Sequence, residues 1–236
     1  MNPPPGQRPE FDQFAERYDE ELARGLTATG ENKDYYARGR MGWLAERIRD
    51  ERHEVRFAMD FGTGTGTSTP LLLELPGIQS VVGVDVSARS LEVARRLHPS
   101  PGIRFILRED YKPECAMDLA FCNGVFHHIP PAERIASVRL VFESLRPGGW
   151  FSLWENNPWN PGTRYVMSRV PFDRDAILLA PSEARRMLRE AGFEILRTDF
   201  LFFFPRRLSW FRGLEPNLRR VPLGGQYQVL ARRALP

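Results

Sequence analysis

The first part of the chain has apolar residues at helical spacing. Phe11, Phe14, Ala15, Tyr18 and Leu22 recur at the i, i+3 and i+4 spacings of one helix face, which predicts an amphipathic helix. A turn rich in Gly and Thr interrupts the pattern, and a second amphipathic segment runs over 34–49. We therefore expect a helical cap over 11–54. The Pro-rich residues before it, 1–10, are expected to form a disordered tail.

From residue 55 onward, short apolar runs alternate with helical patterns. The expected strands cover 55–61, 80–86, 103–107, 116–123, 150–155, 193–204 and 226–232. One expected helix follows the glycine-rich loop after the first strand and ends at 75. The other expected helices cover 87–98, 131–145 and 182–191. Strands that alternate with helices predict an α/β fold with a doubly wound, mainly parallel sheet. Two connections, 156–181 and 205–225, are too long for simple turns and are expected to be functional insertions into a domain over 55–236.

A glycine-rich loop follows the first expected strand. The stretch from Asp60 reads DFGTGTG, with glycines at 62, 64 and 66. The dinucleotide pattern G-x-G-x-x-G would place its third glycine at Thr67. An acid beside the loop is unfavourable for a pyrophosphate but suits a cationic ligand. A second acid, Asp85, ends the next strand, where a carboxylate can accept hydrogen bonds from ribose hydroxyls.

Composition excludes several classes of protein. The net charge is +3, and no run of basic residues is interleaved with exposed aromatics. We therefore expect no nucleic-acid partner. No apolar run is long enough to span a membrane, and the first residues lack a signal-peptide core. The two cysteines, Cys115 and Cys122, are too few for a disulfide framework. A cytoplasmic protein is the expectation.

The glycine loop and four later segments together resemble class I S-adenosylmethionine (SAM)-dependent methyltransferases of the small-molecule type. These segments are Asp85, REDY at 108–111, NGVFHHIP at 123–130 and LRPGGWFSLWE at 145–155. The resemblance covers about 11–233. It implies a Rossmann-like sheet of seven strands in the order 3-2-1-4-5-7-6, with the last strand antiparallel. It also implies SAM as the cofactor and methyl transfer to an O, N or C atom of a small acceptor.

The resemblance assigns roles to individual residues. Asp85 would bind the ribose, and Asp110 would meet the adenine amino group. Arg40, on the helical cap, could pair with the methionyl carboxylate. The full set of expected cofactor-binding residues is Asp60, Gly62, Thr63, Gly64, Gly66, Asp85, Val86, Asp110, Tyr111, Asn123, Tyr18 and Arg40.

His127 and His128 are the candidate catalytic bases, because histidine titrates near neutrality. The alternative is that one packs under the loop and the other shapes the cofactor pocket. Two adjacent histidines provide too few ligands for a metal, so none is expected.

The acceptor is expected at the end of the fifth strand and in the segment after it. Candidate substrate residues are Glu155, Asn156, Trp159 and Asn160, and 168–176 would line the same pocket. A rigid Asx-Pro turn that packs on the sheet remains an alternative for this loop.

The aromatic and Arg-rich segment 200–220 favours a buried strand followed by a loop. A membrane surface or a lipid-linked acceptor is the alternative for this segment.

Two other functions remain open: a nucleotide-dependent oxidoreductase of the same fold and a SAM-binding protein without catalysis. The sequence does not fix the acceptor or the oligomeric state.

Overall fold

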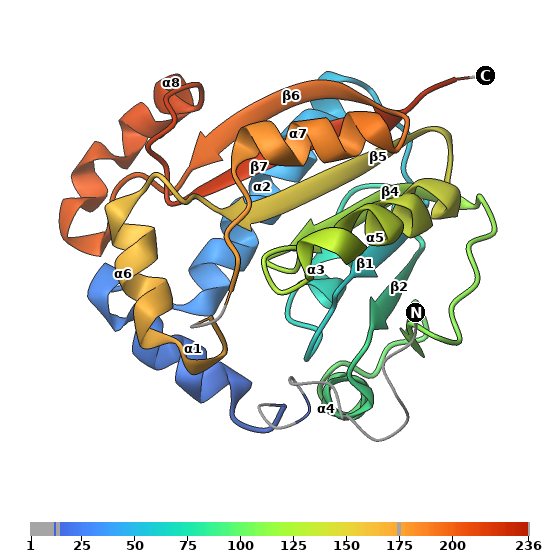
Figure 1. The fold of residues 1–236 in the computed structure, drawn as a ribbon, viewed down its shortest axis with the longest axis horizontal. Helices are drawn as coiled ribbons and strands as arrows, with labels where there is room; N and C mark the ends of the chain where they lie inside the picture. The colour runs from blue at the N-terminus through green and yellow to red at the C-terminus, as the bar shows by residue number, and fades with distance from the viewer. Residues whose placement is uncertain (1–11, 13–14, 174–175, 236) are drawn as a thin grey trace.

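The structure is a computed structural model that describes residues 12, 15–173 and 176–235. Its centre is a single seven-stranded sheet (Figure 1). The strands are β1 (Phe57–Phe61), β2 (Ser80–Asp85), β3 (Ile103–Leu107), β4 (Met117–Asn123), β5 (Leu145–Asn156), β6 (Phe193–Leu201) and β7 (Gln226–Arg233). Their order is β3-β2-β1-β4-β5-β7-β6. The first five strands pair in parallel, and β7 is antiparallel to both neighbours. The predicted fold class and strand order are confirmed.

Helices cover both faces of this sheet. α2 (Lys33–Asp50) and α3 (Thr69–Leu73) share one hydrophobic core with the sheet. α5 (Pro131–Ser144) and α7 (Pro181–Glu190) pack on the other face, which is the near one in Figure 1. α4 (Ala88–Leu97) packs beside β2 and β3.

Trp43 fixes the long helix α2 to the sheet. Its ring packs edge to face on Trp154 of β5, with centroids 5.4 Å apart. Its indole nitrogen donates a hydrogen bond to Asp199 of β6 at 2.9 Å. Both aromatic rings are almost fully buried, so the contact combines apolar burial with a satisfied polar group. α2 is thereby held across the middle of the sheet.

The two long connections contain helices of their own. Residues 156–181 contain α6 (Pro161–Arg169) and the 3₁₀ turn η3 (Pro171–Asp173). Residues 205–225 contain the 3₁₀ segment η4 (Arg206–Leu214) and the short α8 (Glu215–Leu218). α1 (Tyr18–Leu26), which leads through η2 (Thr27–Thr29) to α2, packs against α6 near the point where β5 ends (Figure 1). A Cβ atom at Gly25 of α1 would lie 2.3 Å from Val170, so this contact requires glycine.

Two strand boundaries differ from the prediction by three residues or more. β5 begins at Leu145 instead of Trp150, because Leu145 is buried and already pairs with Met117 of β4. β6 stops at Leu201 instead of 204, and the next residue, Phe202, has a φ of 62° that ends the extended backbone.

The expected tail, 1–10, and the first apolar positions of the cap, Phe11 and Phe14, lie outside the described residues. Among the residues that are described, no helix has the length and apolar character needed to cross a membrane.

Candidate functional site

The glycine loop leaves β1 with three residues in the left-handed region. Gly62, Gly64 and Gly66 have φ values of 73°, 54° and 84°. A Cβ atom at Gly62 would lie 2.3 Å from Val125, so the loop passes directly against the segment after β4. A Cβ at Gly64 would meet nothing within 4 Å. Gly64 therefore leaves open space where the backbone can approach a ligand.

Asp60 is buried at the end of β1 and is held by two threonines. Its Oδ2 atom accepts hydrogen bonds from Thr63 Oγ1 at 3.0 Å and from Thr69 Oγ1 at 2.7 Å. Burial raises the pKa of Asp60 to about 6 despite these bonds. The carboxyl group is ionised at neutral pH in a position with little solvent, so a nearby cation would stabilise it.

Asp85 ends β2 and accepts two backbone hydrogen bonds. Oδ2 accepts from Gly64 N and Oδ1 accepts from Ser87 N, both at 2.8 Å. Ser87 caps α4, since its side chain accepts a hydrogen bond from Ser90 N at 3.1 Å. Asp85 is thus not the helix cap. It links the glycine loop to β2 and lies at the surface of the cavity described next.

A cavity of about 360 Å³ lies between the glycine loop, the end of β2 and the first residues after β4. We call it the glycine-loop cavity. Nine of the expected cofactor-binding residues line it: Tyr18, Arg40, Asp60, Gly62, Thr63, Gly64, Asp85, Val86 and Asn123. The apolar side chain of Val86 is 46% exposed there.

Three expected cofactor-binding residues do not reach this cavity. Gly66 packs near His98, which lies 2.8 Å from the position a Cβ atom would take. Asp110 is exposed outside the cavity, and Tyr111 packs against the core on the α5 and α7 face. Arg108, two residues before Asp110, lines the cavity instead. The structure thus places a cation where the sequence suggested a carboxylate.

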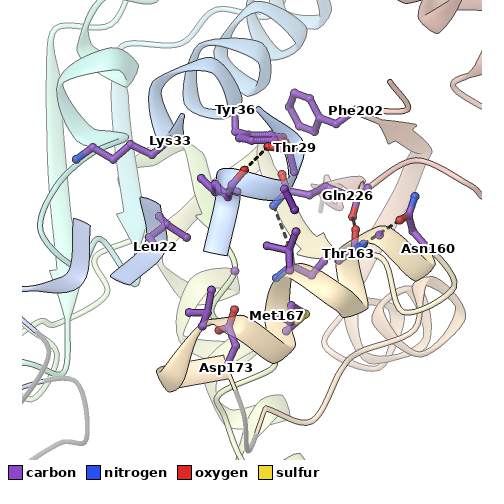
Figure 2. A pocket seen from close by; sticks show the side chains of 18 of the residues that line it. Leu22, Thr29, Lys33, Tyr36, Asn160, Thr163, Met167, Asp173, Phe202 and Gln226 are labelled. Carbon is purple, nitrogen blue, oxygen red and sulfur yellow. Dashed lines mark hydrogen bonds between the residues drawn. The ribbon is translucent and has the colours of Figure 1, made fainter. Parts of the chain in front are cut away.

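A second cavity, of about 450 Å³, lies between the helical cap and α6. We call it the cap cavity. Figure 2 shows Tyr36 and Phe202 at one end of it and Asp173 at the other, with Met167 and Thr163 of α6 between them. Of the expected substrate residues, Asn156 and Asn160 line this cavity. Glu155 and Trp159 do not: Glu155 is fully buried, and Trp159 is 50% exposed beside Phe200.

The two cavities are neighbours that share part of their lining. The shared residues are Tyr18, Leu22, Lys33, Arg40, Asn123, Gly124 and His128. Two polar atoms at this junction, Arg40 Nε and Asn123 Oδ1, are buried without a hydrogen-bond partner among the described residues. The side chain of Arg40 donates a hydrogen bond from Nη1 to Gln226 Oε1 at 2.9 Å. Buried polar atoms in this state indicate a site that a polar ligand completes.

His127 is held between two carboxylates. Its Nδ1 lies 2.5 Å from Glu155 Oε2, and its Nε2 lies 3.5 Å from Asp173 Oδ1. Burial lowers the pKa of His127, but the charges of Glu155 and Asp173 outweigh it and raise the pKa to about 10. His127 is therefore an imidazolium at neutral pH, which disfavours the role of general base. His128 Nε2 lies 3.3 Å from the same Asp173 oxygen and faces both cavities.

Sequence reasoning missed some residues of the site and placed others only by segment. Gln226, at the start of β7, lines the cap cavity but has no motif around it. Phe202, Phe203 and Phe204 line the same cavity, although the pattern favoured a strand through these positions. Asp173 lies in the segment 168–176 that was expected to line the acceptor pocket, and it does line the cap cavity.

Several known proteins are similar to this chain over the part that contains the glycine loop. Residues 59–151 match the methyltransferase domain family. A ubiquinone biosynthesis O-methyltransferase of Nitrosospira multiformis is 29% identical over 77% of this chain and 80% of the relative. A protein of the same name from Thiobacillus denitrificans is 31% identical over 66% of this chain and 70% of the relative.

A trans-aconitate 2-methyltransferase of Rhizobium leguminosarum is 34% identical over 41% of this chain, a match that spans 37% of the relative. Among solved structures, a SAM-dependent methyltransferase from Mesorhizobium loti superposes with a TM-score of 0.61. The match covers 84% of this chain and all of that chain at 20% identity, a level that supports the fold. Together with the glycine loop, the two strand-end acids and the strand order, these matches show that the chain belongs to the class I SAM-dependent methyltransferases.

Proposed function

We propose that the chain binds SAM in the glycine-loop cavity and methylates an oxygen of a small acceptor held in the cap cavity. The observation that carries the proposal is the junction of the two cavities at Arg40, Asn123 and His128. A methyl donor in one cavity and an acceptor in the other would meet there. Proximity and alignment can supply much of the rate enhancement of a direct displacement.

The residues of the glycine-loop cavity match the charges of SAM. Bound SAM supplies an electrophilic methyl group on a positively charged sulfur. Asp60 and Asp85 give the cavity two carboxylates, the first suited to the cationic methionyl end and the second to the ribose hydroxyls. Val86 offers an apolar surface for the adenine ring.

Arg40 is suited to the methionyl carboxylate. Its side chain is buried, and burial lowers the pKa of its guanidinium to about 10. It remains a cation at neutral pH, and no carboxylate among the described residues forms an ion pair with it within 4 Å. A buried cation of this kind is costly unless an anion accompanies it, so a ligand carboxylate would relieve that cost.

The cap cavity suggests an aromatic or unsaturated acceptor that carries oxygen. Tyr35, Tyr36 and Phe202 provide aromatic surface, while Asn156, Asn160 and Gln226 provide amide groups. One group of relatives is named for O-methylation in ubiquinone biosynthesis and the other for trans-aconitate methylation. A catechol and an unsaturated tricarboxylate are therefore the two acceptor classes to test first.

The test is formation of S-adenosylhomocysteine by the purified chain with SAM and each acceptor. The proposal predicts acceptor-dependent turnover that is lost in Arg40→Met and reduced in Asn123→Ala. The absence of turnover with any acceptor, in a protein that binds SAM, would favour a SAM-binding protein without catalysis. NADH binding in place of SAM would favour the oxidoreductase.

A lipid-linked acceptor is a second candidate, which the surface of η4 favours. Trp210 is 71% exposed and Leu214 is 51% exposed, and both follow the Phe204-Pro205 wall of the cap cavity. Arg206 and Arg207 are exposed on the same segment. Such a surface suits the boundary of an anionic bilayer. Sedimentation with anionic vesicles, reduced by Trp210→Ser, would support this acceptor. Equal sedimentation of both proteins would exclude a role of Trp210 in it.

A further inference from the structure

Three potential metal ligands converge beside the cap cavity. Asp173 Oδ1 lies 3.5 Å from His127 Nε2 and 3.3 Å from His128 Nε2. One ligand atom from each of the three side chains can be chosen so that all lie within 4.8 Å of one another. Atoms bound about 2.1 Å from a tetrahedral ion lie roughly 3.4 Å apart, so the two contacts of Asp173 already have suitable spacing.

A second carboxylate orients the first of these histidines. Glu155 Oε2 accepts the hydrogen bond of His127 Nδ1. The other oxygen of Glu155 accepts backbone hydrogen bonds from Val125 at 3.1 Å and Phe126 at 2.7 Å. The glutamate is therefore fixed, and it fixes the imidazole with Nε2 toward Asp173. A carboxylate behind a histidine is the usual outer partner of a metal-bound imidazole.

The charge of the cluster also suits a cation. With both imidazoles neutral, Glu155 and Asp173 leave two negative charges in a place with little solvent. A divalent ion would balance them. Metal binding requires both imidazoles in their neutral form. Two imidazoles and one carboxylate form a ligand set that suits zinc and neighbouring first-row ions better than it suits magnesium or calcium.

The position of the cluster indicates what the ion would do. All three side chains line the cap cavity, and His128 also lines the glycine-loop cavity. Three protein ligands leave a coordination position open, as in zinc sites that act on substrates. An ion held by these three side chains would lie at the edge of the cap cavity.

We propose that His127, His128 and Asp173 bind a divalent first-row transition ion whose open position takes an oxygen of the acceptor. The contact between the ion and an acceptor oxygen rests on the proposed function. The sequence argument against a metal considered two adjacent histidines only, and the fold adds Asp173 from a distant segment.

The first test is Zn²⁺ binding by the full chain after treatment with a chelator, measured by calorimetry and by metal analysis after dialysis. We expect one ion per chain. Asp173→Asn and His128→Ala should weaken binding by at least about tenfold. His53→Ala is the matched control, because His53 stacks on Trp150 away from both cavities and its loss should leave binding unchanged. A wild-type chain that retains no zinc, or variants that bind as tightly as wild type, would overturn the proposal.

The second test uses Co²⁺ in the wild-type chain, so it does not depend on whether a variant folds. Visible absorption typical of a four-coordinate site should appear and should change when catechol is added. A spectrum of free, hydrated Co²⁺ would overturn the site, and a spectrum unaffected by catechol would overturn the acceptor contact.

SAM titration of the same preparations separates this proposal from the proposed function. A chain that binds zinc but does not bind SAM would count against the proposed function and not against the metal site. A chain that binds SAM but does not bind zinc would count against the metal site and not against the proposed function.

Discussion

His127 Nδ1 lies 2.5 Å from Glu155 Oε2, and both side chains are almost completely buried. The contact joins the loop after β4 to the end of β5, next to the junction of the two cavities. Glu155 also accepts two backbone hydrogen bonds from that loop. Glu155 therefore fixes the loop that carries His127 and His128. Its buried side chain has no direct access to a substrate.

Glu155→Gln should destabilise the protein, because the imidazolium of His127 loses a buried anionic partner. We expect the free energy of unfolding to fall by on the order of 3 kcal/mol. Urea denaturation measures it. Glu194→Gln is the control, since the ion pair of Glu194 with Arg232 is solvent-exposed and should matter little. Equal stability of Glu155→Gln and wild type would contradict this role of Glu155.

Asp85→Ala should weaken SAM binding by at least about tenfold, because removal of a charged hydrogen-bond acceptor costs roughly 1.5–3 kcal/mol. The variant also leaves the Gly64 and Ser87 amides without their acceptor. Asp110→Ala should bind SAM like wild type, since Asp110 is exposed outside the cavity. Calorimetry of the two variants compares the strand-end acids directly. A larger loss in Asp110→Ala would restore the adenine contact expected from the sequence.

SAM affinity should increase as the pH rises through about 6. Burial raises the pKa of Asp60 from 3.8 to about 6, so this carboxyl group is neutral below that pH and negative above it. Only the ionised form attracts the cationic end of SAM. For the free protein, the same shift contributes stability in full below about pH 3.8, and this contribution is lost as the pH rises from 3.8 to about 6. Titrations from pH 5 to 8 should show a step in wild type that is smaller in Asp60→Asn, because the amide of that variant does not titrate. Identical pH profiles would exclude Asp60 as its source.

Gly62→Ala should disturb the glycine loop. Gly62 has a φ of 73°, and a Cβ atom there would lie 2.3 Å from Val125. We expect a loss of stability of about 1–3 kcal/mol, together with weaker SAM binding. Gly42→Ala is the contrasting control: Gly42 lies inside α2 with nothing within 4 Å of its Cβ position. That change should stabilise the helix by up to about 1 kcal/mol. Thermal unfolding of both variants checks the difference, and a stable Gly62→Ala protein would contradict it.

The glycine-loop cavity was predictable because local signals determine it, whereas the strand order was expected only from the resemblance to the methyltransferases. Asp60 and Asp85 follow short apolar runs, and parallel strands bring their carboxyl ends to the same edge of the sheet. The helix expected over 87–98 is also a local signal, and Ser87 at its start caps α4.

The polar cluster of the cap cavity was less predictable. Asp173 meets His127 only because η3 folds back over the loop after β4, and Glu155 is turned inward by backbone amides. Such contacts between distant segments have no local pattern. Asp110 stands at the matching place in a motif but is exposed and does not line the cavity, so its adenine contact stays a prediction.

The most direct test of the account is a calorimetric titration of the wild-type chain with SAM, beside a parallel titration with NADH. The account predicts saturable binding of one SAM per chain and no binding of NADH. A folded protein, freed of any co-purified ligand, that binds NADH and fails to bind SAM would contradict it.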